Sequence, residues 1–473
     1  MSIRYRTVNR VEDPLIFLKT KHDVVNGGIV KIKTPDGSIR SGKVLKIEKD
    51  IACIQTFQGT KGLDKDVTEV EFFDQLFSVG FSSEMKGKIF NGLGTLKKTV
   101  DQADIPEIIP EVVREVSGNA INPYDRLYPD DIIKTGISVI DGLNTVIRGQ
   151  KLPIFSGQGM PHNQLAAQIV KQGKVEDEES FVIIFVGIGL LEDDAIYFQD
   201  KFKESGNIHN VVTFLNLAND PTIERLLVPK VALTAAEYFA FDLDMHVLVV
   251  MTDMTNYCEA LRELSASKGE IPGRKGFPGY LYSDLAAIYE RAGRIDGKKG
   301  SITQIPIVSM PNDDITHPIP DLTGYITEGQ IVFSRELSQK GIYPPVDILS
   351  SVSRLMKDAI GEGRTREDHQ DIMNQIFDLY NKSLEIRELK SIIGEESLTT
   401  VDKKTLEFGE NLESYFINQK YDENRSFEKT FNIAWALLSN IPQRKLVRID
   451  RKYLKKYYVS DSRIKNYTGR GVF

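Results

Sequence analysis

The sequence predicts a multidomain protein with an N-terminal β-barrel, a central α/β domain built on a mainly parallel sheet, and a C-terminal α-helical domain. Two observations predict this organisation. The chain has 473 residues, which allows roughly three domains of ~150 residues each. The spacing of apolar residues also changes twice, from strand alternation to buried runs and then to helical spacing. We place the domains at residues 1–75, 76–355 and 356–473.

The N-terminal domain is predicted from short stretches in which apolar and polar residues alternate. Between about residues 23 and 71 these are GGIVKIK, SGKVLKIE, IACIQTF and VTEVEFF, separated by the turn signals PDG and QGTKG. Alternation of this kind is typical of antiparallel strands with one buried face. A small antiparallel sheet or barrel is therefore expected.

The central and C-terminal domains differ in their apolar patterns. From about residue 124 the apolar runs are KLPIFS, FVIIFVG, VVTFL, HVLVVMTD, SITQIPIVSM and QIVFS, which suit parallel strands covered on both faces. Beyond about residue 355, apolar residues recur at helical spacing, as in IMNQIFDLYNKSL and FEKTFNIAWALL. The polar end VSDSRIKNYTGRGVF is expected to be poorly ordered.

Composition excludes several classes of protein. Hydrophobic content of 41%, charged content of 27% and a formal net charge of -7 are ordinary globular values, and the acidic balance argues against nucleic acid as a partner. The start lacks a signal-like apolar core, and no uncharged stretch approaches the ~20 residues that span a bilayer, so we expect a cytoplasmic protein. Two cysteines, Cys53 and Cys258, are too few for a disulfide framework or a four-cysteine zinc site, and we expect inert thiols and no metal site.

The segment SGQGMPHN lies in the setting of a phosphate loop, between an apolar strand and an amphipathic helix. A working loop reads G-x-x-x-x-G-K-[ST], so that backbone N–H groups cradle phosphate, the lysine neutralises it and the hydroxyl holds magnesium. Ser156 to Asn163 departs from this pattern at every fixed position, although Gly157 and Gly159 remain within it.

Each replacement in this loop weakens nucleotide binding for its own physical reason. Pro161 replaces the second glycine and has no N–H to donate. His162 replaces the lysine but is shorter and mostly neutral at pH 7. Asn163 offers an amide where magnesium requires a hydroxyl. The segment alone fits equally a degenerate nucleotide site and an ordinary strand-to-helix turn with Asn163 near the helix start.

Asp253 adds a weak signal for the nucleotide fold. It ends the buried run HVLVVMT, where the acid that lies near magnesium would stand. A lone aspartate after a strand is more often a helix cap. The strands that follow the loop nevertheless favour a nucleotide-binding fold that has lost its phosphate site.

The sequence resembles the B subunit, the non-catalytic one, of V-type and archaeal-type rotary ATPases. The resemblance covers about residues 11 to 449 and is carried by long matches in order along the chain. These include VIDGLNTVIRGQKLPIFSGQGMPHNQLAAQI, GRKGFPGYLYSDLAAIYERAGR, HPIPDLTGYITEGQI, GIYPPVDILSSVSRLMKDAIGEGRTREDH and YFINQKYDENRSFEKT. The basic segment RKLVRIDRKYLKKYY runs past the resemblance, and we expect it to be a solvated helix face, with a docking surface as the alternative.

The resemblance implies a RecA-like nucleotide-binding domain in a ring. Three such chains would alternate with three catalytic A subunits around a central rotor stalk, with a peripheral stalk, on the cytoplasmic face of a membrane that this chain touches only indirectly. ATP or ADP with magnesium would lie at the A–B interface, bound mainly by the A subunit. Such a ring couples ATP hydrolysis or synthesis to proton or sodium transport, and this chain would have no ATPase activity of its own.

The resemblance also assigns roles to single residues. Catalytic subunits carry a water-orienting glutamate after the strand that corresponds to FVIIFVGIG, and Leu190 stands there instead and cannot polarise water. Arg354, in SSVSRL, corresponds to an arginine finger that reaches the neighbouring catalytic site, a task that suits the planar guanidinium. Tyr343, Ser351 and Ser353, in the same segment, are expected at the interface, although Tyr343 could instead stack on a nucleotide.

Alternatives to these roles remain. Without the resemblance, Arg354 would be expected to pair with a local carboxylate such as Asp347 or Asp358. An ATP-hydrolysing motor, such as the flagellar-export ATPase or an F-type head subunit, would have an intact phosphate loop, which Pro161 and His162 contradict. A hexameric RNA translocase of the same fold is opposed by the acidic net charge and by the lack of an RNA-binding N-terminal module.

Overall fold

A computed structural model describes residues 3–5, 8–20, 24–97, 108–118, 120–175, 180–204, 206 and 208–459. The chain forms two compact units. The first contains residues 1–126, 182–308 and 316–326, and the second contains residues 127–181, 309–315 and 327–473. The predicted poorly ordered tail lies, from residue 460 onward, outside the described residues.

The N-terminal part of the first unit is a seven-stranded antiparallel sheet in the order β1-β7-β4-β5-β6-β3-β2. The sheet forms an open half-barrel. Its antiparallel strands confirm the predicted antiparallel sheet or barrel. Its strands are β1 (Ile3–Tyr5), β2 (Arg10–Glu12), β3 (Leu15–Lys19), β4 (Gly28–Lys33), β5 (Ile39–Glu48), β6 (Ile51–Thr56) and β7 (Glu69–Leu76).

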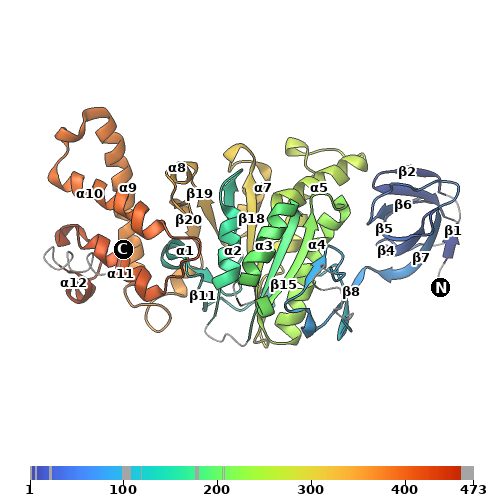
Figure 1. Ribbon diagram of the computed structural model, residues 1–473, viewed down its shortest axis with the longest axis horizontal. Coiled ribbons are helices and arrows are strands. Elements are labelled where there is room, and N and C mark those ends of the chain that lie inside the picture. Colours follow the sequence, from blue (N-terminus) through green and yellow to red (C-terminus); the bar gives the residue numbers. More distant parts are fainter. Residues whose placement is uncertain are drawn as a thin grey trace. The chain divides into compact units, whose positions relative to one another are not determined.

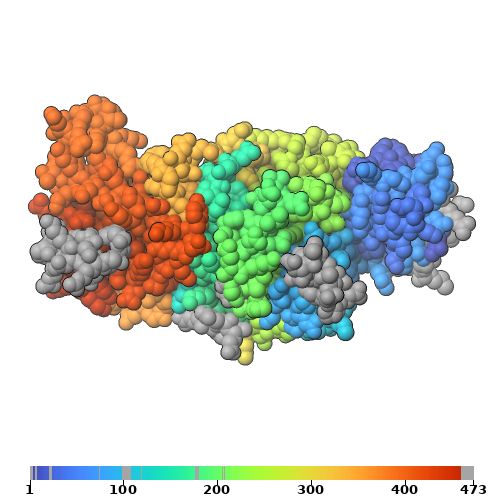
Figure 2. Space-filling model, viewed as in Figure 1, coloured from blue at the N-terminus to red at the C-terminus, as the bar shows by residue number. Residues whose placement is uncertain are grey.

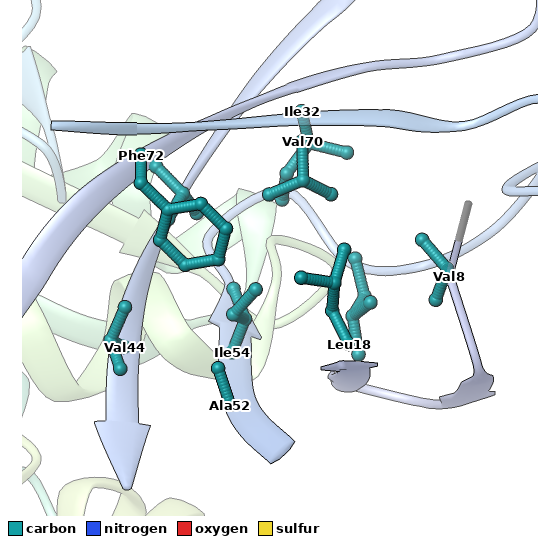
Figure 3. Packing of buried hydrophobic residues seen from close by; sticks show 10 residues of the cluster. Val8, Leu18, Ile32, Val44, Ala52, Ile54, Val70 and Phe72 are labelled. Carbon is teal, nitrogen blue, oxygen red and sulfur yellow. The ribbon is translucent and has the colours of Figure 1, made fainter. Parts of the chain in front are cut away.

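The core of this sheet follows from the alternation along its strands. In β4, Val30 and Ile32 are fully buried while Lys31 and Lys33 are exposed, because successive side chains point to opposite faces. The buried side chains of several strands point toward one another, including Val44 and Phe72 (Figure 3). Burial of this apolar face holds the half-barrel together.

The first unit also contains parallel strands of the central sheet, in the order β18-β16-β14-β15-β9 (Figure 1). They are β9 (Ile89–Asn91), β14 (Phe181–Leu190), β15 (Val211–Leu217), β16 (His246–Thr252) and β18 (Ser301–Met310), with β17 (Gly293–Arg294) antiparallel to β18. Nearly every residue of β14, β16 and β18 is buried, as expected for strands covered on both faces. The helices between them are α3 (Glu192–Glu204), α4 (Thr222–Glu237), α5 (Met254–Ser267), α6 (Leu281–Tyr289) and α7 (Pro318–Ile326).

A short two-stranded antiparallel sheet completes the first unit. It pairs β8 (Ser78–Phe81) with β10 (Val112–Glu115).

The second unit contains the strands around the predicted phosphate loop. Strand β13 (Ile154–Gly157) is parallel to β19 (Gly329–Phe333), and β20 (Val346–Ser353) is antiparallel to β19. Helix α2 (His162–Gln172) follows β13, and α8 (Arg335–Gln339) follows β19. The remaining elements before the loop are β11 (Ile132–Ile133), α1 (Ser138–Leu143) and β12 (Val146–Ile147).

The C-terminal part of the second unit is helical, as the sequence predicts. It contains α9 (His369–Ile393), α10 (Thr400–Asn411), α11 (Phe427–Leu438) and α12 (Arg451–Tyr457). The atoms of these helices, drawn in orange to red, pack against one another (Figure 2). Among the described helices, none has the length and apolar composition needed to cross a membrane.

Candidate functional site

The loop after β13 has the strand–turn–helix path of a phosphate loop. Gly159 adopts a left-handed conformation with φ of +76°, which glycine allows without strain. Pro161 is the N-cap of α2, and its side chain supplies no capping hydrogen bond. The helix begins at His162, so the orphan N–H groups of its first turn would be the natural donors to an anion.

Two backbone donors of this loop are used within the loop itself. The N–H of Met160 donates to the Gly157 carbonyl at 3.2 Å, and the N–H of His162 donates to the Met160 carbonyl at 2.8 Å. Pro161, between them, has no N–H. Three consecutive positions therefore offer no free donor to a phosphate group.

An ion pair lies directly beside the first glycine of the loop. Arg335, the first residue of α8, binds Asp313 through two guanidinium nitrogens, and its Nη2 also donates to the Gln158 carbonyl at 3.0 Å. A Cβ added to Gly157 would lie 2.6 Å from Arg335 Nη2 and would clash with the Asp313 carboxylate. The hydrogen bond from Arg335 lowers the pKa of the Asp313 carboxyl, so the carboxylate stays ionised and paired with the guanidinium. This ion pair fills the space beside Gly157 and commits the Arg335 guanidinium to Asp313 and to the Gln158 carbonyl.

The side chains at the lysine and hydroxyl positions of the loop do not replace the missing groups. His162 Nδ1 lies 3.2 Å from Ser156 Oγ, so the imidazole bonds back to the end of β13. Asn163 is half-buried at the second position of α2. Gly157, Gly159, His162 and Asn163 are thus brought together in one loop, but as a closed turn and not as a phosphate cradle.

Asp253 belongs to the first compact unit and caps a helix. Its carboxylate accepts a hydrogen bond from the N–H of Thr255 at 2.9 Å at the start of α5. Asp253 thus takes the cap role that is the commoner one for an aspartate after a strand.

Leu190 ends β14 and is part of the apolar core of the first unit. Its side chain is only 5% exposed. A Cβ added to Gly187 would come within 2.6 Å of Leu190 Cδ1, so the leucine fills the space above that glycine. No carboxylate function can be supplied from this position.

Arg354 follows β20 and has an exposed side chain. Its backbone N–H donates to the Glu328 carbonyl at 3.0 Å, whereas its Nη1 makes only a long contact of 3.4 Å with the Thr327 carbonyl. Among the described residues it forms no ion pair. The two carboxylates that could have paired with it bind other groups: Asp347 accepts from Ser350, and Asp358 accepts from Tyr128.

The three residues expected at the interface with Arg354 are buried within the second unit. Ser351 Oγ donates to the Asp347 carbonyl at 2.6 Å, and Ser353 Oγ donates to the Thr145 carbonyl at 2.9 Å. Tyr343 is 5% exposed, and its hydroxyl donates to Gln168 Oε1 at 2.8 Å. The part of all three in contacts between subunits stays a prediction.

Both cysteines have raised pKa values. Burial raises the pKa of the Cys258 thiol well above its ordinary value and also raises that of Cys53. A raised pKa keeps a thiol protonated and unreactive at neutral pH.

Sequence reasoning missed the Asp313–Arg335 pair. The two residues are 22 positions apart, in segments that carry no motif, and only the fold brings them to the loop. The repeated acids of PNDD and the isolated arginine of FSREL were the only signals available.

Two family models match most of the chain. The nucleotide-binding domain of the ATP synthase alpha/beta family matches residues 136–353. The C-terminal domain of V and A type ATP synthase matches residues 358–458. The second match includes the basic segment up to Tyr458, which corrects the expectation that this segment runs past the family.

Individual relatives cover nearly the full length. The chain is similar to a V-type ATP synthase beta chain of Thermotoga neapolitana, with 54% identity over 454 residues that make up 96% of this chain and 98% of the relative. It is also similar in structure to a unique ATP synthase subunit from Nanoarcheaum equitans, with a TM-score of 0.71 and 39% identity. That alignment covers 90% of this chain and 98% of the solved one.

Proposed function

The chain belongs to the V-type ATP synthase beta chains, or B subunits, and from this we propose that it is a non-catalytic head subunit that completes the active site of a neighbouring catalytic subunit. Membership of such a complex implies partner subunits. Three copies alternate with three catalytic A subunits in a ring around a central rotor stalk, supported by a peripheral stalk. The ring couples ATP hydrolysis or synthesis to the transport of protons or sodium ions.

The observation that carries this proposal is the exposed guanidinium of Arg354, which forms no ion pair with any residue that the structure describes. An exposed arginine next to carboxylates would ordinarily pair with one of them, yet Asp347 and Asp358 bind other groups. The backbone N–H of Arg354 is bonded to the Glu328 carbonyl, and its exposed side chain makes one long hydrogen bond, to the Thr327 carbonyl, which a partner's phosphate group could replace. A guanidinium can grip two oxygens of a transferring phosphoryl group and stabilise the charge that develops there.

This chain's own phosphate loop does not fit Mg-ATP. The N–H groups of Met160 and His162 bond within the loop, Pro161 has no N–H, and the Asp313–Arg335 ion pair occupies the space beside Gly157. The nucleotide with its magnesium is therefore bound mainly by the A subunit, and this chain contributes Arg354 in trans.

We predict that Arg354→Lys depresses ATP turnover of the reconstituted ring severely while leaving its assembly intact. The lysine keeps the charge but loses the planar fork. Loss of an arginine finger costs ~10³–10⁵ in rate, or about 4–7 kcal/mol of barrier, whereas a surface ion pair contributes only about 0–1 kcal/mol. The measurement is steady-state phosphate release by rings containing wild-type A subunits, with assembly checked by size.

The matched control is Arg448→Lys, because the Arg448 side chain is 60% exposed and makes only a 4.0 Å contact with Asp378. It should change turnover by less than twofold. An assembled Arg354→Lys ring that turns over within a few-fold of wild type would show that Arg354 is a structural residue and would remove the proposed role.

A further inference from the structure

We infer that the ion pair between the buried Lys151 side chain and the partly exposed Glu328 positions Arg354 for its task. This inference rests on the proposed function, since it assigns to two further residues the orientation of the arginine. Lys151 and Glu328 are 177 positions apart in the sequence and carry no catalytic motif. They would act as positioning residues, because neither is expected to touch the nucleotide.

Three contacts join Lys151 to Glu328. The Lys151 Nζ lies 2.7 Å from Glu328 Oε1, and the backbone N–H of Lys151 donates to Oε2 at 2.8 Å. The backbone N–H of Glu328 in turn donates to the Lys151 carbonyl at 3.1 Å. The Lys151 side chain is only 3% exposed, so its charge requires a partner in this place. Charge-assisted bonds of this kind fix geometry more firmly than neutral ones.

The main chain of Glu328 passes this constraint directly to Arg354. The Glu328 carbonyl accepts the backbone N–H of Arg354 at 3.0 Å and Nε2 of Gln150 at 3.1 Å. Gln150 Nε2 also donates to Ser353 Oγ at 3.0 Å, so the residue before the arginine is held by the same side chain. The Lys151–Glu328 pair is thus one bonded step away from the backbone that carries the guanidinium.

Strands β19 and β20 are packed too closely at Gly329 for the backbone beside Arg354 to move without straining the pairing of the two strands. Gly329 lies opposite Ser353 in the pairing of β19 with β20. A Cβ at residue 329 would clash with the Val352 carbonyl. The close pairing of Gly329 with Ser353 therefore fixes the position of the backbone at the end of β20, directly before Arg354.

The test uses a double substitution in the reconstituted ring with wild-type A subunits. Lys151→Met with Glu328→Gln removes both charges, so that no unpaired buried charge is left to unfold the chain. We expect the ring to assemble. We also expect kcat to fall about 100-fold and KM for ATP to change less than threefold, because displacing a catalytic group by ~1 Å lowers the reaction rate more than it weakens substrate binding. Lys151→Arg, which keeps the charge, should retain most of the activity.

A double-mutant cycle with Arg354 separates positioning from general stability. If the pair acts through the guanidinium, adding Lys151→Met and Glu328→Gln to Arg354→Ala should lower turnover by less than twofold beyond Arg354→Ala alone. The inference is overturned if the pair substitutions lower turnover by the same factor with and without Arg354→Ala. It is also overturned if the assembled pair variant turns over ATP like wild type.

Failure of this inference can be told apart from failure of the proposed function. Arg354→Ala rings with wild-type turnover would reject the proposed function, whereas inactive Arg354→Ala rings beside fully active pair variants would reject only the positioning role. Should the double substitution prevent assembly, Glu328→Asp shortens the same carboxylate and should lower kcat about tenfold at unchanged KM. Wild-type kcat in that ring would equally overturn the inference.

The matched control is another buried ion pair, Arg291 with Glu237, in the first compact unit. Arg291 Nε lies 2.7 Å from Glu237 Oε1, and the arginine side chain is 1% exposed. Arg291→Met with Glu237→Gln removes a comparable pair in a compact unit that contains neither Arg354 nor the Lys151–Glu328 pair. Turnover of this control ring should stay within threefold of wild type.

Discussion

His369 places a fully buried imidazole at the start of α9. Its Nε2 lies 2.9 Å from the Gly142 carbonyl and its Nδ1 lies 3.0 Å from Thr365 Oγ1, which suits a neutral ring that donates to the carbonyl and accepts from the hydroxyl. Burial lowers the pKa of His369 to about 4. The imidazole is therefore neutral in the folded protein throughout the physiological range.

We predict that acid weakens the helical region through His369. The unfolded chain takes up a proton near pH 6.5, but the folded chain does so only near pH 4. Stability from this group is thus fully present above pH 6.5 and is lost as the pH falls toward 4. At about 1.4 kcal/mol per pH unit, the loss amounts to about 3 kcal/mol.

Urea unfolding between pH 7 and pH 4 measures this loss, followed by the fluorescence of the single tryptophan, Trp435, whose Nε1 bonds to Asp368. His369→Gln is the control, since an amide keeps both hydrogen bonds but does not titrate. As the pH falls from 7 to 4, the free energy of unfolding of the wild type should drop by about 3 kcal/mol relative to that of His369→Gln. Parallel pH profiles would contradict the assignment.

At the scale of single residues, the sequence predicted what depends on the chemistry of one position. Pro161 cannot donate and Leu190 cannot polarise water in any fold, so both losses follow from residue type. The Asp313–Arg335 pair could not be predicted, because its effect on the loop arises from a contact that only the folded chain makes. The same holds for the Lys151–Glu328 pair.

Strands β19 and β20 depend on a glycine where they meet. Gly329 has φ of +144°, a conformation that other residues rarely adopt, and its missing Cβ makes room for the Val352 carbonyl. We predict that Gly329→Ala lowers the free energy of unfolding by about 2–4 kcal/mol, because backbone strain and the clash add together.

Urea unfolding of the purified chain provides the measurement. Gly279→Ala is the control, since no atom lies within 4 Å of the position of an added Cβ and the change should stay within about 0.5 kcal/mol. If Gly329→Ala and Gly279→Ala unfolded at the same free energy, β19 and β20 would be able to move apart at Gly329 without destabilising the chain.

At the scale of elements, apolar runs predicted strands well and polar ones did not. HVLVVMTD and FEKTFNIAWALL were assigned correctly as β16 and α11, because one run is continuously apolar and the other has helical spacing. Strand β20 was not predicted, since VDILSSVS contains three serines. Two of their hydroxyls bond to the Asp347 and Thr145 carbonyls, and such partners are not visible in the sequence.

The whole molecule is built from segments that are far apart in the sequence. A change in the spacing of apolar residues can mark where one kind of secondary structure ends. It cannot show that residues 127–181 belong to the same compact unit as residues 327–473. The Gln150–Ser353 hydrogen bond, between residues 203 positions apart, is one of the contacts that join them.

We predict that the isolated chain does not hydrolyse ATP at a rate of ~1 per second, the low end of ordinary enzymes. It has no free donors at three positions of the loop, no lysine there and no base at Leu190. Phosphate release by the purified chain is the measurement. His162→Lys with Asn163→Thr should be equally inactive, because the base is still missing, and turnover in either protein at that rate would refute the non-catalytic assignment.

Leu190 bears on whether catalysis could be restored under the proposed function. The leucine is part of the apolar core, so Leu190→Glu would bury a carboxylate at a site only 5% exposed. An unpaired buried charge costs about 3–5 kcal/mol, whereas Leu190→Met should cost less than about 1.5 kcal/mol, and urea unfolding of the two variants measures the difference. Under the proposed function, restoring the glutamate alone would give a less stable protein that still lacks the loop lysine. Selection for stability would then oppose the recovery of an independent active site in this subunit.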